Sequence, residues 1–258
     1  MTANPDPREL LGLARRAAHQ AGALVKNAPV HSLDTATKSS PTDLVSEMDR
    51  ASEELIRGII RRARPDDGLI GEEGGSKPSE SGLSWLVDPI DGTVNYLRGL
   101  PNYSISIAVV SEQGAMAGVV YDPTLDETFT AIDGHGAALN GNPITCSSTA
   151  LPRAVIGTGF SYSAARRARQ AQVLVGVLPA VGDIRRPGSA AVSLCWVACG
   201  RLDGFFETGL KPWDFAAGAL IARESGADVR GAELGEPRDE LLVASAPSIT
   251  ADLYPLLS

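Results

Sequence analysis

The stretch that decides the interpretation of this 258-residue chain is Trp85-Leu86-Val87-Asp88-Pro89-Ile90-Asp91-Gly92-Thr93-Val94-Asn95-Tyr96. Its apolar start predicts a buried strand that delivers Asp88, and Pro89 then fixes the backbone torsion φ at the exit of that strand. Asp91 follows three residues after Asp88, so both carboxylates can converge at this turn. Two carboxylates at one turn repel each other unless a cation lies between them, and oxygen-only ligation is typical of Mg²⁺.

The next two residues add a feature that is typical of anion binding. Gly92 has no side chain, so an anion can approach the backbone there, and Thr93 offers a hydroxyl and an N–H group where a helix begins. The whole segment therefore predicts a metal site beside a phosphate site. Taken alone, however, an Asp-Pro-x-Asp-Gly sequence is explained more simply by the turn preferences of Asp and Gly.

Three further segments place acids beside apolar runs. Glu72 and Glu73 follow the short apolar run at 69–71, Asp214 starts an apolar helix, and Asp49 lies two turns into a predicted helix. Each acid has a simple structural explanation when it is considered by itself. The glutamates are then a solvated pair, Asp214 is a cap or first-turn acid, and Asp49 lies on an exposed helix face.

In their order along the chain, these segments resemble the inositol monophosphatase family of Mg²⁺-dependent, lithium-sensitive phosphatases that act on sugar phosphates. Two signature motifs carry the resemblance, namely residues 85–96 and Trp213-Asp214-Phe215-Ala216-Ala217-Gly218. The similarity runs from about Leu10 to Leu257. A third stretch, Arg185-Arg186-Pro187-Gly188-Ser189-Ala190-Ala191, is most similar to the bacterial branch of the family. Agreement at both signature motifs removes the force of the simpler explanations.

The resemblance implies a role for each residue that matches the family. It implies two Mg²⁺ ions, which are held by Glu72, Asp88, the backbone carbonyl of Ile90, Asp91 and Asp214. It implies a catalytic set that orients and deprotonates water, formed by Asp49, Thr93 and Glu72. It implies that the phosphate and the sugar alcohol are contacted by seven residues, namely Gly92, Thr93, Gly188, Ser189, Ala190, Glu207 and Asp214. A third, weaker metal would belong to a loop that carries Lys38, with Glu73 in support.

The expected reaction is hydrolysis of inositol 1-phosphate, or a similar polyol phosphate, with water activated by two metals. The metal core recognises only the phosphate group, so histidinol phosphate and other sugar or nucleotide phosphates remain alternative substrates. A different class of function is also open, because some bacterial relatives bind the transcription machinery. Arg185, Arg186 and Arg201 are candidates for a patch that faces such a partner, and they are equally typical of a solvated surface.

Composition limits the partners of this chain. Its 23 Lys and Arg residues stand against 31 Asp and Glu residues, and this net charge of −8 disfavours nonspecific binding to nucleic acids or anionic membranes. No run approaches the ~18–20 apolar residues of a membrane span, and early acids break any signal-peptide pattern. Cys146, Cys195 and Cys199 form no CxxC pair, which favours a reducing cytoplasm. The family resemblance adds a homodimer to these expectations.

Hydrophobic spacing predicts the order of the elements. Helices are expected at 7–27, 43–60, 163–176, 189–199 and 213–224. Strands are expected at 67–71, 84–88, 103–110, 115–121, 125–131, 154–158, 182–185, 203–206, 227–229 and 241–244. The first half then forms a mostly antiparallel sheet and the second half a layered α/β arrangement, with a seam near 150. The prediction is one domain over 1–258, with subdomains of about 1–150 and 151–258, and the resemblance implies an αβαβα sandwich.

Overall fold

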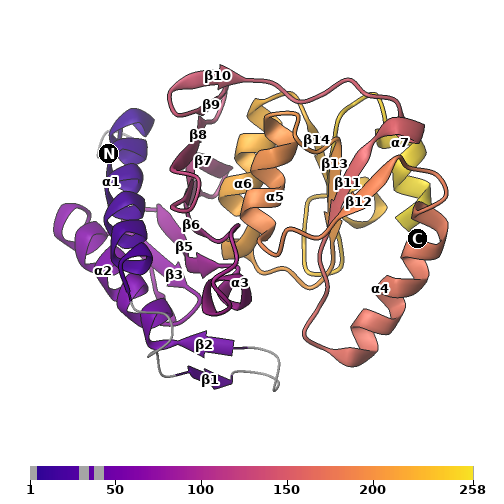
Figure 1. The fold of residues 1–258 in the computed structure, drawn as a ribbon. Coiled ribbons are helices and arrows are strands. Elements are labelled where there is room, and N and C mark those ends of the chain that lie inside the picture. Colours follow the sequence, from indigo (N-terminus) through magenta and orange to yellow (C-terminus); the bar gives the residue numbers. More distant parts are fainter. Residues whose placement is uncertain (1–4, 29–34, 38–43, 258) are drawn as a thin grey trace.

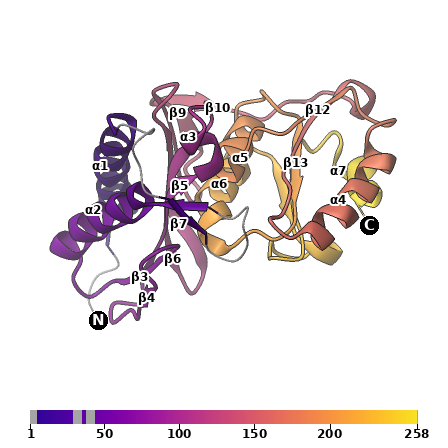
Figure 2. The same ribbon diagram turned by 60° about the horizontal axis from the view of Figure 1, so that its bottom comes forward.

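The protein is built from five alternating layers of helices and sheets. The computed structural model describes residues 5–28, 35–37 and 44–257. Two helices cover the outer face of a first sheet, two helices lie between this sheet and a second one, and two more cover the far side (Figure 1). The same layer order is visible after a rotation of 60° (Figure 2). The predicted αβαβα sandwich is therefore confirmed.

The first sheet holds eight strands in the order β10-β9-β8-β7-β6-β5-β3-β4. All its neighbours are antiparallel except β3 and β5, which run parallel. The strands are β3 (Gly68–Gly71), β4 (Ser76–Lys77), β5 (Ser84–Asp91), β6 (Ser104–Ser111), β7 (Gly114–Asp122), β8 (Glu127–Ile132), β9 (Ala137–Leu139) and β10 (Asn142–Ile144).

The second sheet holds five strands in the order β12-β11-β13-β15-β14. Strand β11 runs parallel to β12 and β13, and the other pairs are antiparallel. The strands are β11 (Val155–Thr158), β12 (Asp183–Arg185), β13 (Gly204–Glu207), β14 (Asp228–Arg230) and β15 (Leu242–Ser245). The carboxyl ends of β11 and β13 point the same way, so the segments that follow them lie side by side.

The helices form the remaining three layers. Helices α1 (Pro7–Lys26) and α2 (Glu47–Ala63) form one outer layer, and α4 (Ala164–Val177) with α7 (Thr250–Leu253) forms the other (Figure 1). Between the sheets lie α5 (Ala190–Ala198) and α6 (Pro212–Glu224). Helix α5 is apolar and buried almost all round, as a helix with a sheet on each side must be. Residues of α5 and α6 pack with those of both sheets, so the two halves share one interior.

The structure differs from the sequence expectation at several short elements. Residues 44–46 are not the start of the second helix but a strand, β2, which pairs with β1 (Thr35–Thr37). The five-residue helix α3 (Thr93–Leu97) begins at Thr93, as the sequence predicted, whereas the segments β4, β9, β10 and α7 were not anticipated. Each of these four has two to four residues, too few for an apolar period to be recognised. Lys38, expected in a metal-binding loop, lies outside the described residues.

In the part of the chain that the structure describes, no helix combines the length and the apolar character needed to cross a bilayer.

Close packing of α1 on the first sheet gives a test of the fold. A β-carbon at Gly22 would come within 2.5 Å of the Tyr121 ring on β7, whereas one at Gly12 of the same helix would meet only the end of Arg16, at 3.7 Å. We expect Gly22→Ala to lower the free energy of unfolding by about 1–3 kcal/mol through overpacking. Gly12→Ala should instead be neutral or stabilising by up to about 1 kcal/mol, because alanine favours the helix.

Urea unfolding of both variants checks this prediction. Equal stability of the two alanine variants would show that α1 does not pack on β7 as closely as the structure indicates.

Candidate active site

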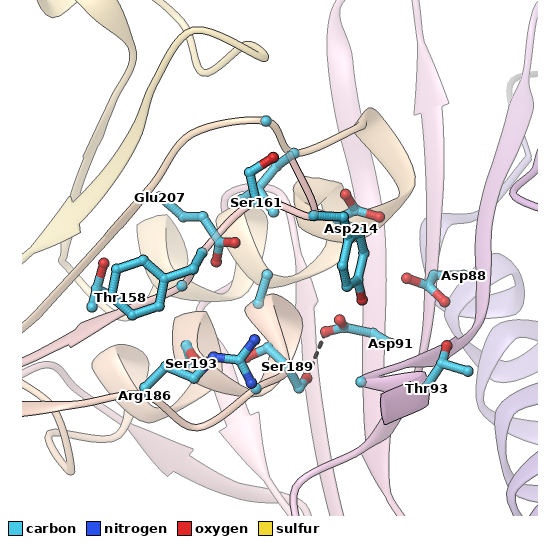
Figure 3. Close-up of a pocket in the computed structure, with 18 of the residues that line it drawn as sticks. Asp88, Asp91, Thr93, Thr158, Ser161, Arg186, Ser189, Ser193, Glu207 and Asp214 are labelled. Carbon is cyan, nitrogen blue, oxygen red and sulfur yellow. Dashed lines mark hydrogen bonds between the residues drawn. The ribbon is translucent and has the colours of Figure 1, made fainter. Parts of the chain in front are cut away.

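A pocket of about 150 Å³ lies where the two halves of the chain meet, and it gathers most of the residues expected to be functional. Figure 3 shows Asp88, Asp91 and Thr93 approaching it from the first half and Ser189, Glu207 and Asp214 from the second. The expected residues that line it are Glu72, Asp88, Ile90, Asp91, Gly92, Thr93, Gly188, Ser189, Ala190, Glu207 and Asp214. Asp49 lies behind this wall, and Glu73 is not part of the lining.

An irregularity at the end of β5 turns two acids into the pocket. The pairing of β5 with β6 shifts between Asp88 and Asp91, where Pro89 removes a backbone donor. The Ile90 N–H group donates instead to Asp88 Oδ1, at 3.1 Å. Ser52 of α2 donates to the carbonyl of Pro89, also at 3.1 Å. The turn that presents both acids is thus held from the outer helix layer.

Two glycines allow the halves to meet closely beside the acids. Gly92 has a φ of +95°, and a β-carbon there would lie 3.0 Å from the carbonyl of Asn102. Gly188 has a φ of +99° and lies directly against the amide of Asn95. That amide donates hydrogen bonds to Asn102 O at 2.9 Å and to Pro187 O at 2.8 Å. Asn95 therefore ties the segment after β5 to the segment before α5.

Asp91 and Asp214 accept hydrogen bonds at the starts of the two central helices. Asp91 Oδ2 accepts from Ser189 Oγ at 2.5 Å, across about one hundred residues of sequence (Figure 3). It also accepts from the Ala191 N–H at 2.7 Å. Asp214 accepts from the Lys211 N–H at 2.7 Å, in the capping arrangement considered for it from the sequence. Both side chains therefore line the pocket while each is also held by a helix start.

Burial and mutual repulsion dominate the electrostatics of the pocket. Burial raises the pKa of Asp91 to about 6. Burial also raises the pKa of Asp88 well above its ordinary value, and the charges of Glu72 and Asp91 raise it further. The pKa of Asp214 is raised well above its ordinary value by burial, with a further contribution from Asp91. A group of acids that resists ionisation together is typical of a site completed by a cation.

The donor set fits a hard cation, although the oxygens are not already gathered around one. Among the described residues, no three or more His, Cys, Asp or Glu side chains are grouped closely enough to hold a metal ion. Asp91 and Asp214 are turned towards hydrogen-bond donors of the protein. Four carboxylates and a backbone carbonyl in one pocket nevertheless form the all-oxygen set that Mg²⁺ prefers. The individual ligand assignments therefore stay predictions.

Asp49 does not lie on an exposed helix face. Its side chain is 0% exposed, and its Oδ1 accepts a hydrogen bond from Thr93 Oγ1 at 3.1 Å. The same hydroxyl is 3.1 Å from the carbonyl of Ile90. A buried carboxylate thus lies directly behind a hydroxyl that faces the pocket, which is the arrangement expected of a group that receives a proton.

Glu207 ends strand β13 and faces the pocket from the second half (Figure 3). Its carboxylate lies against the backbone of Gly159, where any β-carbon would overlap it. Burial raises the pKa of Glu207 to about 8, and the charge of Asp91 contributes to this rise. The ammonium group of Lys211, four residues further along the chain, lies 3.9 Å from the carboxylate of Asp239.

One wall of the pocket and the positions of the arginines were not predicted from the sequence. Residues 158–162, after β11, and 208–210, after β13, also line the pocket. The glycines at 157 and 159 were the available signal, since glycine in a strand often marks close approach. Arg186 lines the pocket, whereas Arg185 pairs with Asp183 and Arg201 with Glu127. The three arginines thus have different neighbours in the structure.

Comparison with known proteins identifies this chain as a hydrolase of the phosphatase class. The chain belongs to the inositol monophosphatase family, whose model matches residues 6–256. Members of this family are generally Mg²⁺-dependent.

Relatives and solved structures match over nearly the full length. A Mycobacterium tuberculosis protein named inositol-1-monophosphatase SuhB is 40% identical, covering 98% of this chain and 94% of its own. A Pasteurella multocida protein named Nus factor SuhB is also 40% identical, with coverages of 95% and 94%. The crystal structure of extragenic suppressor protein suhB from Bartonella henselae superimposes with a TM-score of 0.92 at 35% identity, covering 97% and 98%.

The raised pKa values predict how stability depends on pH in the metal-free protein. The folded-state pKa values of Asp91, about 6, and Glu207, about 8, lie above those of an unfolded chain. The folded protein therefore binds more protons between about pH 5 and pH 8, and stability is lost as the pH rises through this window. We expect the Tm in EDTA to be lower by roughly 3–6 °C at pH 7.5 than at pH 5.5.

Scanning calorimetry at both pH values checks this, and Mg²⁺ added at the higher pH should restore the Tm because it binds only the folded state. A Tm that is higher at pH 7.5 in EDTA would contradict the assigned repulsion.

Proposed function

We propose that this chain hydrolyses inositol 1-phosphate, or a similar polyol phosphate, to the free alcohol and inorganic phosphate. The observation that carries the proposal is the pocket itself. It combines the buried Asp88 and the part-buried Asp91 and Asp214 with Glu207, which faces them from the other sheet. The printed name of the Mycobacterium tuberculosis relative supports the same substrate class. An assay of phosphate release from inositol 1-phosphate with Mg²⁺ tests the proposal directly.

Five groups of the chain are proposed to hold two Mg²⁺ ions: Glu72, Asp88, the carbonyl of Ile90, Asp91 and Asp214. When bound, Mg²⁺ supplies Lewis-acid chemistry, which neutralises phosphate charge and makes water more acidic. The all-oxygen donor set and the raised pKa of Asp88 support this assignment. The same binding would offset the repulsion among the buried acids.

The chain's own residues are proposed to handle the proton of the attacking water. The Thr93 hydroxyl donates a hydrogen bond to Asp49, so its oxygen can accept a hydrogen bond from a water in the pocket. When the water loses a proton to the Thr93 oxygen, Thr93 passes its own hydroxyl proton to Asp49, whose complete burial keeps it out of exchange with solvent. The N–H groups of Gly92 and Thr93 are proposed to hold the phosphate, because the left-handed Gly92 opens the backbone there.

The alcohol is proposed to lie against the second half of the chain. Glu207 offers an acceptor oxygen to ring hydroxyls in either protonation state, and Gly188, Ser189 and Ala190 form the adjacent wall. Arg186 on the same side adds a donor. Alternating donors and acceptors are suited to a polyol, in which each hydroxyl both donates and accepts.

Asp91→Asn should reduce the rate of phosphate release to less than about a tenth of the wild-type rate, since losing a transition-state clamp costs at least ~1.4 kcal/mol. The asparagine oxygen can still accept from Ser189 Oγ and the Ala191 N–H, so the fold should persist. Circular dichroism and phosphate release at saturating Mg²⁺ measure both effects. A folded variant with near-normal turnover would remove Asp91 from the metal site.

Glu207→Gln tests which part of the substrate the second half of the chain recognises. At a pH above about 8, where Glu207 is ionised, we expect kcat/KM for inositol 1-phosphate to fall about tenfold or more, since hydrogen bonds to a charged group contribute about 1.5–3 kcal/mol each. Activity on 2-glycerophosphate, which lacks the ring, should change much less. Equal losses on both substrates would show that Glu207 supports the metal site or the fold instead.

Other phosphate esters are the nearest alternatives for the substrate. The proposed phosphate site would serve histidinol phosphate, or another sugar or nucleotide phosphate, equally well. Measurement of kcat/KM for each of these esters at one Mg²⁺ concentration ranks them as substrates. Preference for a nucleotide over every polyol phosphate would overturn the polyol assignment while leaving the phosphatase intact.

A second candidate function is binding to the transcription machinery. The names of two relatives as Nus factor SuhB, from Pasteurella multocida and Escherichia coli, favour it. The acids in this chain's pocket favour an enzyme, because a pure binding module needs none of them. Capture of transcription elongation factors by the Asp91→Asn variant as well as the wild type would establish a role that is independent of catalysis.

We further infer a cytoplasmic homodimer in which each chain is one domain over 1–258 with a seam near residue 150. Helices α5 and α6 support the single domain because both sheets pack on them. The isologous dimer is the commonest soluble assembly and agrees with the family resemblance. The net charge of −8 argues against direct nucleic-acid and membrane partners.

A further inference from the structure

Helix α2 buries a polar stripe beside its apolar residues. Its buried face includes four polar residues, Asp49, Ser52, Glu53 and Arg57, at the spacing of one helix face. Asp49 and Ser52 hold the segment at the end of β5. Glu53 and Arg57 lie further along the helix, next to the loop at 72–75 that joins β3 to β4, and no step of the proposed reaction uses them.

The Glu53 and Arg57 side chains together hold the backbone of this loop. Glu53 Oε2 accepts from the Glu73 N–H at 2.7 Å, and Glu53 Oε1 accepts from the Gly74 N–H at 2.7 Å. Arg57 Nε donates to Glu53 Oε1 at 2.6 Å, and its Nη2 donates to the carbonyl of Gly75 at 2.5 Å. Three successive residues of the loop are thus bonded to one buried ion pair.

Two glycines, one just before the loop and one within it, leave the space that this ion pair occupies. A β-carbon at Gly71 would overlap the Glu53 carboxylate, and one at Gly74 would come within 2.5 Å of Glu53 and 2.7 Å of Arg57. Glu53 and Arg57 are 1% and 3% exposed. Larger residues at either glycine would push the loop away from the helix, so the glycines and the ion pair form one unit.

Stability alone is a weak reason for such a pair. Taking two charges out of water costs several kcal/mol per ion, and apolar residues of similar volume often stabilise a fold as well or better. What the pair adds is a defined loop conformation, since its hydrogen bonds fix the backbone at Glu73, Gly74 and Gly75. The residue directly before these three is Glu72, which lines the pocket and whose charge raises the pKa of Asp88.

We propose that Glu53 and Arg57 are positioning residues that fix the 72–75 loop, and thereby set the affinity of the pocket for Mg²⁺ through Glu72. The inference rests on the proposed function in one respect, namely that Glu72 is a ligand of Mg²⁺. Without the pair, the loop loses its attachment to α2. Glu72 must then be ordered by the cation itself, and this ordering weakens binding.

The chain offers a matched control at the other end of the same strand. Arg64 and Asp67 form an ion pair at 2.9 Å just before β3, in which Asp67 is also buried and accepts from the Trp85 indole at 2.9 Å. This pair fastens the end of β3 that lies away from Glu72. Arg64→Met therefore removes an arginine from a comparable ion pair without touching the loop.

The test compares Arg57→Met with Arg64→Met in the full chain, with Mg²⁺ binding measured by titration calorimetry in the absence of substrate. We expect Arg57→Met to weaken Mg²⁺ binding about tenfold, in line with other residues that orient metal ligands. The Mg²⁺ concentration for half-maximal phosphate release should rise by the same factor, and the rate at saturating Mg²⁺ should change much less. Arg64→Met should lower the Tm and leave Mg²⁺ binding unchanged.

Hydrogen exchange gives a readout that does not depend on the metal. The amides of Glu73 and Gly74 should exchange faster in Arg57→Met than in Arg64→Met, because only the former loosens the Glu53 carboxylate. If Arg57→Met does not fold, Arg57→Lys replaces it, since one lysine nitrogen does not reproduce separate bonds to Glu53 and Gly75. That variant should still bind Mg²⁺ more weakly than the wild type.

Unchanged Mg²⁺ affinity in the Arg57 variant, or an equal loss in both variants at a temperature where both are folded, would overturn the proposal. The proposed function fails separately: a wild type that binds Mg²⁺ but releases no phosphate from any ester would refute the reaction and leave the calorimetric comparison valid.

Discussion

Repulsion among carboxylates that are kept away from water is the constraint on which the rest of this structure depends. Asp88 is 2% exposed, and the charges of Glu72, Asp91 and Asp214 all oppose its ionisation. Such a group is tolerable only where the surrounding protein supplies donors or a cation compensates the charge. The structure supplies donors individually, with an N–H for Asp214 and a hydroxyl and an N–H for Asp91.

The surrounding fold can be understood as the support that this cluster needs. The break in β5 directs Asp88 and Asp91 into the pocket, the start of α5 donates hydrogen bonds to Asp91, and the start of α6 carries Asp214. Helix α2 holds the segment at the end of β5 and the 72–75 loop from behind. These supports come from three layers: the first sheet, the central helices and the outer helices. Rigid elements converge on the pocket, which is the arrangement by which a site keeps its geometry when its own charges oppose it.

The sequence predicted those parts of the site that follow directly from strands and helices. The stretch from Trp85 to Thr93 showed the strand, its turn and the helix start, and the structure contains all three. The long helices and the two sheets were recognisable because their apolar periods are sustained. The second half's contribution, at Glu207 and Asp214, was predicted through family resemblance, since no local pattern says which distant segments meet.

What escaped prediction was polar and buried. Glu53 and Arg57 occupy positions where a charged pair on a helix normally indicates solvent, and only the fold shows that both are covered by the 72–75 loop. Considered by itself, Asp49 had the same simple explanation, an exposed helix face, and only the family resemblance assigned it to the catalytic set. The wall at 158–162 was missed because pocket lining depends on how β11 and β13 lie side by side, which their sequences do not state.

The hydrogen bond from Ser189 to Asp91 joins residues that are 98 positions apart, and it lies in the middle of the layers. Such distant pairing slows folding, because the entropy of closing the intervening loop is lost before the contact forms. The pocket is therefore among the last regions that the chain can complete during synthesis. Until α5 has left the ribosome, Asp91 lacks its hydrogen-bond partners, and until α6 follows the pocket lacks Asp214. A truncated or nascent chain therefore carries the signature motif without the site.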